Sequence, residues 1–281
     1  MKVIKTVKDI REEIKQLKIK GKSVGFVPTM GFLHDGHISL VKESVANNDV
    51  TVVSIFVNPT QFGPNEDLES YPRDLERDTK LVTDAGADIV FFPEPSEIYP
   101  DGYCTTVSVD GLTKVLCGLS RPTHFDGVTT VVSKLFNIVT PDRAYFGSKD
   151  YQQLQVIKRM VTDLNICVEV VGMPIIREAD GLAMSSRNIY LKDDERESAL
   201  SLSKSFNVVT ELVEQGERDA KVVRQKIVDF IDSHTHANVD YVEVVHAADL
   251  YSLDKITEEF VVALAVKVGG ARLIDNKLFE I

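Results

Sequence analysis

The sequence lacks the patterns that mark several common classes of protein. It has no CxxC or HExxH spacing, so it indicates no zinc site. No GxSxG elbow or Cys/His nucleophile pattern stands out, which argues against a covalent hydrolase. No apolar run reaches the roughly 18 residues that could span a membrane, and residues 1–5 lead into an amphipathic segment rather than a signal peptide. We therefore expect a cytoplasmic, soluble protein with no membrane partner.

Positive charge is also scarce. Lys and Arg number 32 against 43 Asp and Glu, which gives a formal net charge of −11. Because affinity for nucleic acid depends mainly on neutralising phosphates, we expect no nucleic-acid partner. A small anionic substrate in a locally basic cleft is compatible with this balance. The three cysteines, Cys104, Cys117 and Cys167, are odd in number and typical of a reducing compartment.

The 281 residues suffice for one large or two ordinary domains. Strand-like runs alternate with helix-like segments as far as residue 171. The run at 50–57 is continuously apolar and rich in β-branched residues, as in a buried parallel strand. The other expected strands are 24–27, 88–92, 143–146 and 167–171, and the expected helices include 72–85, 128–139 and 151–164. This alternation predicts an α/β fold with a doubly wound parallel sheet.

The pattern changes after Pro174. Two helices, at about 193–214 and 219–233, precede three strand-like runs. Those runs are 239–247, 260–268 and 272–280. Helices followed by strands predict a smaller C-terminal α+β domain, with the boundary near 174–176.

The segment from Pro28 to His37 carries the strongest local signal. An apolar run, 24–27, stops at Pro28, a loop with two glycines follows, and a helix is expected from about Ile38. This layout places backbone N–H groups and a positive dipole end against a phosphate. The dipole disfavours protonated His34 and His37 in the first turn, and a bound triphosphate would reverse that preference. The alternative is a loop residue and a cap-region residue with no ligand.

Two more loops, 58–63 and 147–150, follow expected strands, so they should lie at the same sheet edge. Lys149 opposes the helix dipole there, which favours a phosphate partner. Asp150 can bind in the same place or simply cap the next helix. The loop at 184–187 should face the same crevice. Its Ser185, Ser186 and Arg187 offer two hydroxyls and a bidentate cation for a triphosphate, and an ordinary polar loop is the alternative.

Two neutral amides, Gln61 and Gln153, fall near this edge and can hold hydroxyls and carboxylates without repelling an anion. Each can equally be a solvated surface residue. No metal cage is visible, so Mg²⁺ is expected to arrive with the phosphates of ATP. Asp78 is a candidate for a nearby carboxylate, and an exposed position on a charged helix is its alternative.

Six stretches, taken in order, resemble the pantoate–β-alanine ligase family over essentially the whole chain. This family belongs to the nucleotidyltransferase superfamily, which shares an HxGH loop with class I aminoacyl-tRNA synthetases. The stretches are 28–37, 56–63, 71–73, 121–128, 146–153 and 177–188. Met184 to Arg187 occupies the place of the KMSKS loop of the synthetases but lacks its lysines. We therefore expect Lys149 and Arg187 to supply that charge.

The resemblance implies that ATP, (R)-pantoate and β-alanine give pantothenate, AMP and pyrophosphate through a pantoyl adenylate. It also implies a Rossmann-like domain over 1–175 that binds nucleotide and pantoate, a lid domain over 176–281, and a homodimer. Two other readings stay open, an adenylyltransferase acting on a phosphate ester and a nucleotide sensor without catalysis. The neutral pair Gln61 and Gln153 favours the ligase, because a phosphate acceptor would call for more cations.

The resemblance also assigns roles to residues. Catalysis falls to His34, His37, Lys149 and Arg187, with His37 as the usual proton donor. Gln61 and Gln153 hold pantoate, supported by Asn58, Tyr71 and Arg121. The residues assigned to ATP are Met30, Gly31, Phe32, Leu33, His34, Asp35, Gly36, His37, Gly147, Ser148, Lys149, Asp150, Ile176, Met184, Ser185, Ser186 and Arg187.

Overall fold

The computed structural model describes residues 1–64, 66 and 68–281. The chain forms two compact units. Unit 1 comprises Met1–Asp110, Arg121–Ser148 and Val156–Pro174, and unit 2 comprises Gly111–Ser120, Lys149–Gln155 and Ile175–Ile281. Most of unit 2 follows Pro174, and two short earlier segments, Gly111–Ser120 and Lys149–Gln155, also belong to it. The division into domains over 1–175 and 176–281 stays a prediction.

Unit 1 is built on a parallel sheet of six strands, in the order β1-β4-β3-β2-β5-β6. This confirms the predicted α/β class with a doubly wound sheet. The strand β1 was not predicted, because three residues leading directly into a helix leave too short a pattern. The strands are β1 (Lys2–Ile4), β2 (Val24–Thr29), β3 (Val50–Ile55), β4 (Ile89–Phe91), β5 (Arg143–Gly147) and β6 (Glu169–Met173).

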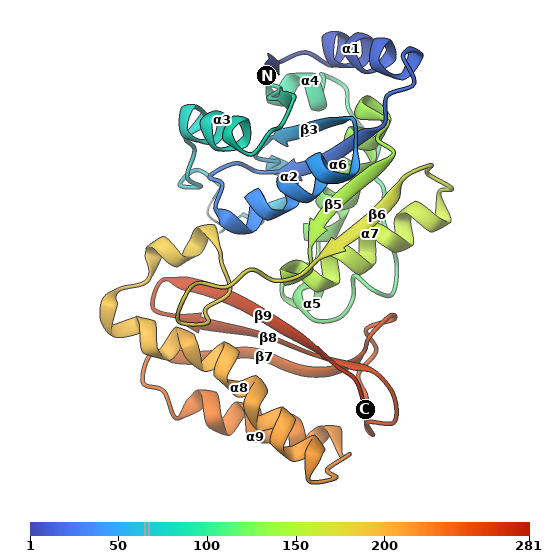
Figure 1. Cartoon of the computed structure of the whole chain (residues 1–281). Helices are drawn as coiled ribbons and strands as arrows, with labels where there is room; N and C mark the ends of the chain where they lie inside the picture. Colours follow the sequence, from blue (N-terminus) through green and yellow to red (C-terminus); the bar gives the residue numbers. More distant parts are fainter. Residues whose placement is uncertain (65, 67) are drawn as a thin grey trace. The chain divides into compact units, whose positions relative to one another are not determined.

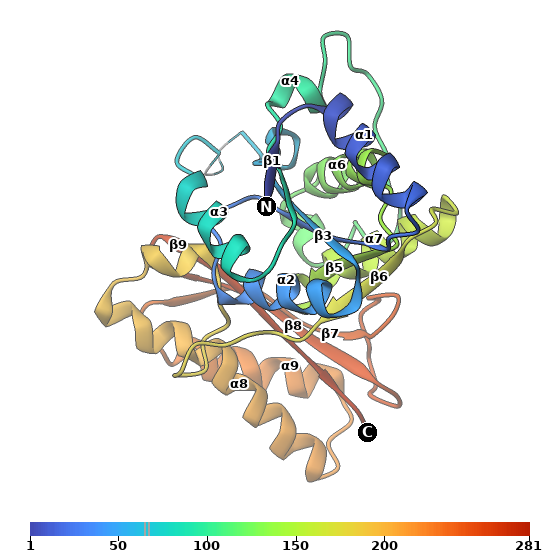
Figure 2. The same cartoon turned by 45° about the horizontal axis from the view of Figure 1, so that its top comes forward.

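Helices cover both faces of this sheet, with α2 and α3 on one side and α1 and α6 on the other (Figures 1 and 2). On the α2 side the apolar side chains include Val27, Val53 and Val90. On the other side Phe26 packs edge-on against Phe136 of α6, at 6.4 Å between ring centroids. The helices of unit 1 are α1 (Val7–Ile19), α2 (Asp35–Asn47), α3 (Leu75–Asp84), α4 (Pro95–Ile98) and α6 (His124–Val139), with the 3-10 turn η1 (Pro59–Gln61). The 3-10 turn η2 (Ser148–Asp150) and helix α7 (Tyr151–Asp163) are divided between the two units, since Lys149–Gln155 belongs to unit 2.

The central strand β2 contains a proline. The apolar run was expected to stop at Pro28, but the strand continues to Thr29. The carbonyl of Thr29 accepts a hydrogen bond from Phe56 N, at the end of β3, at 3.0 Å. Because successive residues of a strand direct their backbone groups to opposite sides, the backbone of Pro28 is directed toward β5. In the observed register β5 pairs with β2 only at Gly25 and Phe26, so the missing N–H of Pro28 disrupts no ladder bond.

Unit 2 is an antiparallel sheet of β7 (Ala237–His246), β8 (Phe260–Val268) and β9 (Ala271–Phe279). The predicted order of helices followed by strands is confirmed. One face packs on α8 (Arg196–Glu214) and α9 (Ala220–Asp232) (Figure 1). On the other face Leu116 and Tyr151 pack against Val245 and Val261. The remaining short elements are α5 (Cys117–Ser120), η3 (Ser186–Tyr190) and η4 (Asp193–Glu195).

Some predicted bounds shift for local reasons. The helix expected over 72–85 begins at Leu75, because the Asp74 carboxylate caps it by accepting from Arg77 N at 3.0 Å. The strand expected over 167–171 is Glu169–Met173, since the chain first turns at Asn165 with a φ of 51°. Within the described part of the chain, no helix is long and apolar enough to cross a membrane.

Candidate active site

The strand order of unit 1 reverses between β2 and β5. From β2 the chain proceeds through β3 to β4 in one direction, and from β5 to β6 in the other. Ligands of doubly wound sheets bind beyond the carboxyl ends of the strands at such a switch point. The loop at 30–34, which follows β2, and Ser148, which follows β5, both lie there, as the sequence predicted.

The two histidines of this loop cap helix α2. His34 is the N-cap residue, and its Nδ1 accepts from Gly36 N at 3.2 Å. His37 reaches back, and its Nδ1 accepts from His34 N at 3.3 Å. The ring centroids lie 4.1 Å apart. The pair therefore forms a capping box in which histidines replace the usual Ser/Thr and Glu/Gln.

These bonds determine where the ring protons lie. A nitrogen that accepts from an N–H carries no proton, so each neutral imidazole carries its proton on Nε2. The Nε2–H group of each ring is thus the donor that could meet an anion. The cap interpretation and the phosphate interpretation are consequently compatible, because they use opposite nitrogens of the same ring.

Asp78 lies beneath the same loop. Its carboxylate is fully buried and accepts from Phe32 N at 2.6 Å and Leu33 N at 2.8 Å. Burial raises the pKa of Asp78, and the two backbone bonds oppose that rise. The alternative of an exposed position on a charged helix is therefore wrong. No group of three or more His, Cys, Asp or Glu among the described residues could hold a metal ion, so a carboxylate near Mg²⁺ stays a prediction for Asp78.

The loop above Asp78 has an unusual backbone. Gly31 has a φ of 87° and Phe32 a φ of 51°, both in the left-handed region. A Cβ at Gly31 would lie 3.1 Å from Asp78 Oδ2. Arg77, which sequence reasoning missed, donates from Nη2 to Leu33 O at 2.9 Å and lies over the Phe32 ring at 5.1 Å. Arg77 and Asp78 together fix the loop, and a pocket of about 290 Å³ lies against it.

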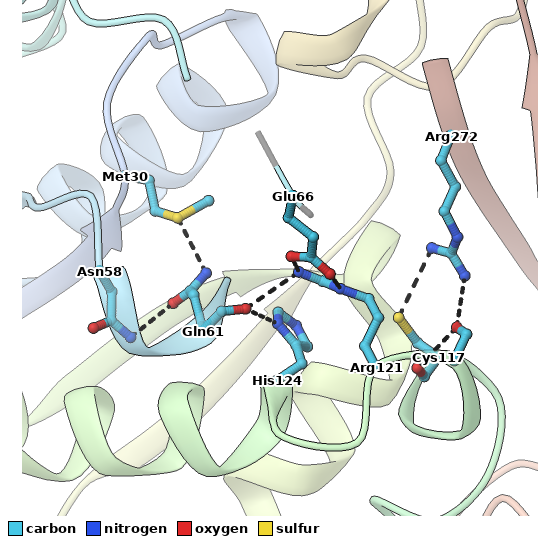
Figure 3. Close-up of polar contacts among 9 residues, drawn as sticks. Met30, Asn58, Gln61, Glu66, Cys117, Arg121, His124 and Arg272 are labelled. Atoms are coloured by element: carbon cyan, nitrogen blue, oxygen red, sulfur yellow. Dashed lines mark hydrogen bonds and ion pairs between the residues drawn. The ribbon is translucent and has the colours of Figure 1, made fainter. Parts of the chain in front are cut away.

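The side-chain amide of Gln61 is held by two neighbouring side chains (Figure 3). Its Oε1 accepts from Asn58 Nδ2 at 3.1 Å, and its Nε2 lies 3.1 Å from Met30 Sδ. Asn58 is 1% exposed, and it also donates to Gly127 O at 3.1 Å and accepts from Tyr99 Oη at 2.7 Å. Asn58 therefore supports Gln61, and its contact with a substrate stays a prediction.

The backbone carbonyl of Gln61 is held as well (Figure 3). It accepts from Arg121 Nη2 at 3.3 Å and lies 2.9 Å from His124 Nδ1. Arg121 Nε also donates to Glu66 Oε1 at 2.6 Å. Burial would raise the pKa of Glu66, but the bond and charge of Arg121 outweigh it and the pKa is lowered. Sequence reasoning assigned no role to His124 or Glu66, because their partners lie about sixty positions away in the sequence.

Helix α6 closely approaches the turn η1, which contains Gln61. A Cβ at Gly127 would lie 2.5 Å from Thr60 O and 2.6 Å from Gln61 N, so only glycine fits there. Tyr71, predicted to support the substrate, is buried and packs edge-on against Phe62 at 5.8 Å between centroids. The structure therefore joins Asn58, Gln61 and Arg121 in one network and packs Tyr71 against Phe62, and the support of substrate by Tyr71 stays a prediction.

Leu33 is held by the core and by its backbone hydrogen bonds. Its side chain lies in the core beside α2, and its N–H and carbonyl are bonded to Asp78 and Arg77. Its assignment to ATP, like those of Asp35 and Gly36 in the first turn of α2, stays a prediction.

In unit 2, Lys149 lies in the turn η2. Its side chain is 19% exposed, with Nζ 4.0 Å from Asp150 Oδ2. Its carbonyl accepts from Asn276 Nδ2 at 2.8 Å. Gln153 is half-buried in the first turn of α7. The roles predicted for Lys149, Asp150 and Gln153 stay predictions.

The segment 176–188 of unit 2 forms a hairpin. Met184 N donates to Ile176 O at 3.0 Å, and Glu178 N donates to Leu182 O at 2.8 Å. Ser185 caps η3, since its Oγ accepts from Arg187 N at 3.3 Å. The structure thus places Ile176 beside Met184, and Ser185, Ser186 and Arg187 together at the start of one turn.

The comparison with known families decides the identity. The sequence model described as pantoate-beta-alanine ligase matches residues 2–278. The chain belongs to the pantoate–β-alanine ligase family. The expectation from the six motifs is confirmed, and the chain is an ATP-using ligase of pantothenate biosynthesis. A nucleotide sensor without catalysis is accordingly the wrong interpretation.

Individual relatives match along their whole length. A pantothenate synthetase of Acetivibrio thermocellus is 59% identical over 281 residues, which is 100% of both chains. The crystal structure of pantothenate synthetase from Thermus thermophilus is 44% identical, with a TM-score of 0.93 and 99% of each chain covered. The pantoate–β-alanine ligase of Francisella tularensis, complexed with beta-gamma ATP and β-alanine, is 36% identical, with a TM-score of 0.80 and coverage of 99% and 97%.

Proposed function

We propose that this chain condenses (R)-pantoate with β-alanine through a pantoyl adenylate, releasing AMP and pyrophosphate. The observation that carries the proposal is the histidine pair at the start of α2, in which the Nδ1 atom of each ring accepts a backbone N–H group. In a neutral imidazole the proton then lies on Nε2. That arrangement presents neutral donors at a helix N-terminus, where a phosphate binds well. The Francisella tularensis relative, whose complex holds a form of ATP and β-alanine, supports ATP and β-alanine as the substrates here.

The first step is adenylation. A pantoate carboxylate oxygen attacks the α-phosphorus of ATP, and the bond from that phosphorus to the bridging oxygen of pyrophosphate breaks. Negative charge moves onto the leaving group, and prepositioned donors stabilise it. We assign this task to His34 and His37 in unit 1 and to Lys149 and Arg187 in unit 2, with His37 donating a hydrogen bond from its Nε2–H. Each should contribute about 10²–10³-fold in rate, on the scale of other oxyanion donors.

The second step is acyl transfer. The β-alanine amine attacks the carbonyl carbon of the adenylate, the bond from that carbon to the AMP oxygen breaks, and AMP leaves. The mixed anhydride is already activated, so no covalent bond to the enzyme is needed. We assign Gln61 and Gln153 to pantoate, and Asn58 and Arg121 to the support of Gln61.

Magnesium is proposed as the companion of ATP. Among the described residues no cluster of His, Cys, Asp and Glu fits a protein-made cage. Asp78, the one candidate carboxylate, uses its oxygens on two backbone N–H groups. No protein-made metal cage is therefore visible among the described residues, and we propose that Mg²⁺ binds through substrate phosphates and water, with Asp78 as a nearby carboxylate.

Two further assignments rest on the resemblance and on composition alone. We propose a homodimer, which light scattering coupled to size-exclusion chromatography would test against a mass of 31.3 kDa for one chain. We also propose a cytoplasmic location, consistent with three cysteines that form no disulfide among the described residues. Fractionation of cells that express a tagged chain would test the location.

The decisive assay measures AMP and pyrophosphate with ATP and pantoate, with and without β-alanine. We expect stoichiometric AMP only with both substrates, and enzyme-bound pantoyl adenylate with pyrophosphate release when pantoate is alone. Lys149→Ala should slow adenylation, whereas Lys158→Ala, on the exposed face of α7, should not. Transfer of AMP to a phosphate ester, or no turnover with pantoate, would overturn the proposal.

A further inference from the structure

The strand β9 contains two adjacent polar residues that are buried, Asp275 at 2% exposure and Asn276 at 6%. A buried carboxylate and a buried amide are costly unless both find hydrogen-bond partners. Neither residue belongs to the motifs that suggested the ligase reaction. Their partners therefore show what the two residues contribute.

The two side chains point to opposite faces of the sheet, because successive residues of a strand alternate. Asp275 lies opposite Leu264, whose side chain packs toward α8 and α9. Asn276 lies opposite Ala263, which packs on the other face with Tyr151. These two adjacent residues of β9 can therefore bind one chain segment on each face of the sheet.

Asn276 holds the turn that carries Lys149. Its Nδ2 donates to Lys149 O at 2.8 Å. Lys149 lies in a three-residue 3-10 turn at the start of α7, where a backbone rotation would redirect its side chain. The bond from Asn276 therefore fixes the backbone from which the Lys149 side chain projects.

Asp275 holds the hairpin that carries Met184 to Arg187. Its carboxylate makes two parallel bonds to Arg177, at 2.7 Å from Nη1 to Oδ2 and 3.0 Å from Nη2 to Oδ1. Arg177 Nη1 also donates to Gly181 O at 3.1 Å, across the hairpin. A bidentate arginine–carboxylate pair specifies orientation as well as attraction. Asp275 therefore sets the position of the hairpin on the sheet.

A third hydrogen bond connects Asp275 with Asn276. Asp275 Oδ1 also accepts from Asn276 N at 2.8 Å. Within unit 2, a single dipeptide of one strand thus anchors both Lys149 and the hairpin that carries residues 184–187. These are the two segments of unit 2 to which triphosphate contacts were assigned.

We propose that Asp275 and Asn276 are positioning residues for adenylation, which hold Lys149 and Arg187 in a fixed relation within unit 2. The proposal rests on the proposed function of Lys149 and Arg187. Neither residue needs to touch substrate. Both act through a backbone segment, so their loss should slow adenylation and spare the acyl transfer from a preformed adenylate.

The test uses Asn276→Ala and Asn276→Asp in the full-length protein. Aspartate keeps the shape of the side chain but, when ionised, cannot donate to Lys149 O. The rate of pantoate-dependent pyrophosphate exchange should fall by up to about 100-fold in both variants, as expected for small misplacements of a reacting group. The Asp variant should recover as the pH is lowered, because a protonated carboxyl can donate again. The rate of pantothenate formation from added pantoyl adenylate and β-alanine should stay near that of the wild type.

Asp275→Asn and Asp240→Asn form a matched pair for the hairpin contact. Asp240 also binds an arginine of β9, Arg272, at 2.8 Å, but this pair touches neither Lys149 nor the hairpin. Asp275→Asn should slow pyrophosphate exchange, whereas Asp240→Asn should not. If Asp275→Asn does not fold, as judged by circular dichroism, the Asn276 variants decide the matter.

A double-mutant cycle separates positioning from general stability. If Asn276 acts through Lys149, Asn276→Ala should add little to the loss already caused by Lys149→Ala. Equal loss in both half-reactions, additive losses in the cycle, or wild-type exchange in the Asn276 variants would each overturn the inference. Absence of pantoate-dependent exchange in the wild-type enzyme would instead mean that the proposed function itself had failed.

Discussion

The backbone nitrogen of His34 lies 3.3 Å from Nδ1 of His37, so the His37 side chain accepts the backbone N–H of His34. His34 in turn caps Gly36 through its own Nδ1. Protonation at either Nδ1 would break one of these bonds and place a positive charge at a helix N-terminus. The structure of the helix start therefore favours neutral rings with their protons on Nε2.

Replacing His34 separates capping from anion binding. Asparagine is a good N-cap residue, so His34→Asn should leave the free energy of unfolding nearly unchanged, whereas His34→Ala should lower it by up to about 1 kcal/mol. Both variants lose the imidazole donor, so both should slow adenylation by about 10²–10³-fold. Urea denaturation and single-turnover adenylation measure the two effects. Normal adenylation in His34→Asn would show that the ring serves only as a cap.

Replacing Asp78 tests the support of the loop. In Asp78→Asn one acceptor remains for the two N–H groups of Phe32 and Leu33, so one buried donor loses its partner. We expect a loss of about 1–3 kcal/mol in the free energy of unfolding, together with a higher KM for ATP. The control is Glu76→Gln, on the exposed side of the same helix. Equal stability and KM in the two variants would contradict this role of Asp78.

Adding a methyl group at Gly127 should disturb Gln61. The new Cβ would meet the backbone of Thr60 and Gln61 at 2.5–2.6 Å, and neither atom can rotate away. Gly127→Ala should lower the free energy of unfolding by about 1–3 kcal/mol and raise the KM for pantoate more than that for ATP. Gly270→Ala is the matched control, because a Cβ there meets nothing within 4 Å. A KM for pantoate that stays at the wild-type value would contradict the link between α6 and Gln61.

The Arg121–Glu66 pair predicts a dependence of stability on pH. The pKa of Glu66 lies below its ordinary value of 4.5, because the bond and charge of Arg121 outweigh burial. A depressed folded-state pKa adds stability above the ordinary value, and this is lost as the pH falls through the folded value. The free energy of unfolding should therefore fall more steeply below pH 4.5 in the wild type than in Glu66→Gln.

Denaturant titrations between about pH 3 and 6 would measure the free energy of unfolding as a function of pH. This range extends roughly one or two pH units to each side of an ordinary glutamate pKa. In an Arg121→Gln background, Glu66→Gln should lose most of its effect. Parallel curves for the wild type and Glu66→Gln would show that the ion pair does not act on stability.

Much of the fold and of the nucleotide loop could be predicted, because their signals are local. Alternating β-branched runs and helices gave the parallel sheet, and the strand, glycine loop and histidines placed the loop at its edge. The capping geometry of His34 and His37 was beyond the sequence. It depends on which ring nitrogen faces the backbone, which residue types alone do not specify.

The contacts of the supporting residues could not be predicted, because they join positions that are distant in sequence. Asp78 lies in a charged helix and is buried only because the left-handed turn at Gly31 and Phe32 folds over it. Asn58 and Arg121 resemble ligand-binding residues by type, yet their polar atoms bind Gln61 and Glu66. Asp275 and Asn276 did carry a signal, as two consecutive polar residues within a strand-like run, but the strand pattern does not name their partners.

In the proposed reaction pantoate attacks the α-phosphorus of ATP with its own carboxylate oxygen. Pantoate labelled with ¹⁸O in both carboxyl oxygens tests this directly, with mass spectrometry of the products after reaction with ATP and β-alanine. Attack by the carboxylate predicts one ¹⁸O atom in the phosphate of AMP, one in the amide of pantothenate and none in pyrophosphate. Label in pyrophosphate or in inorganic phosphate, with none in AMP, would contradict it.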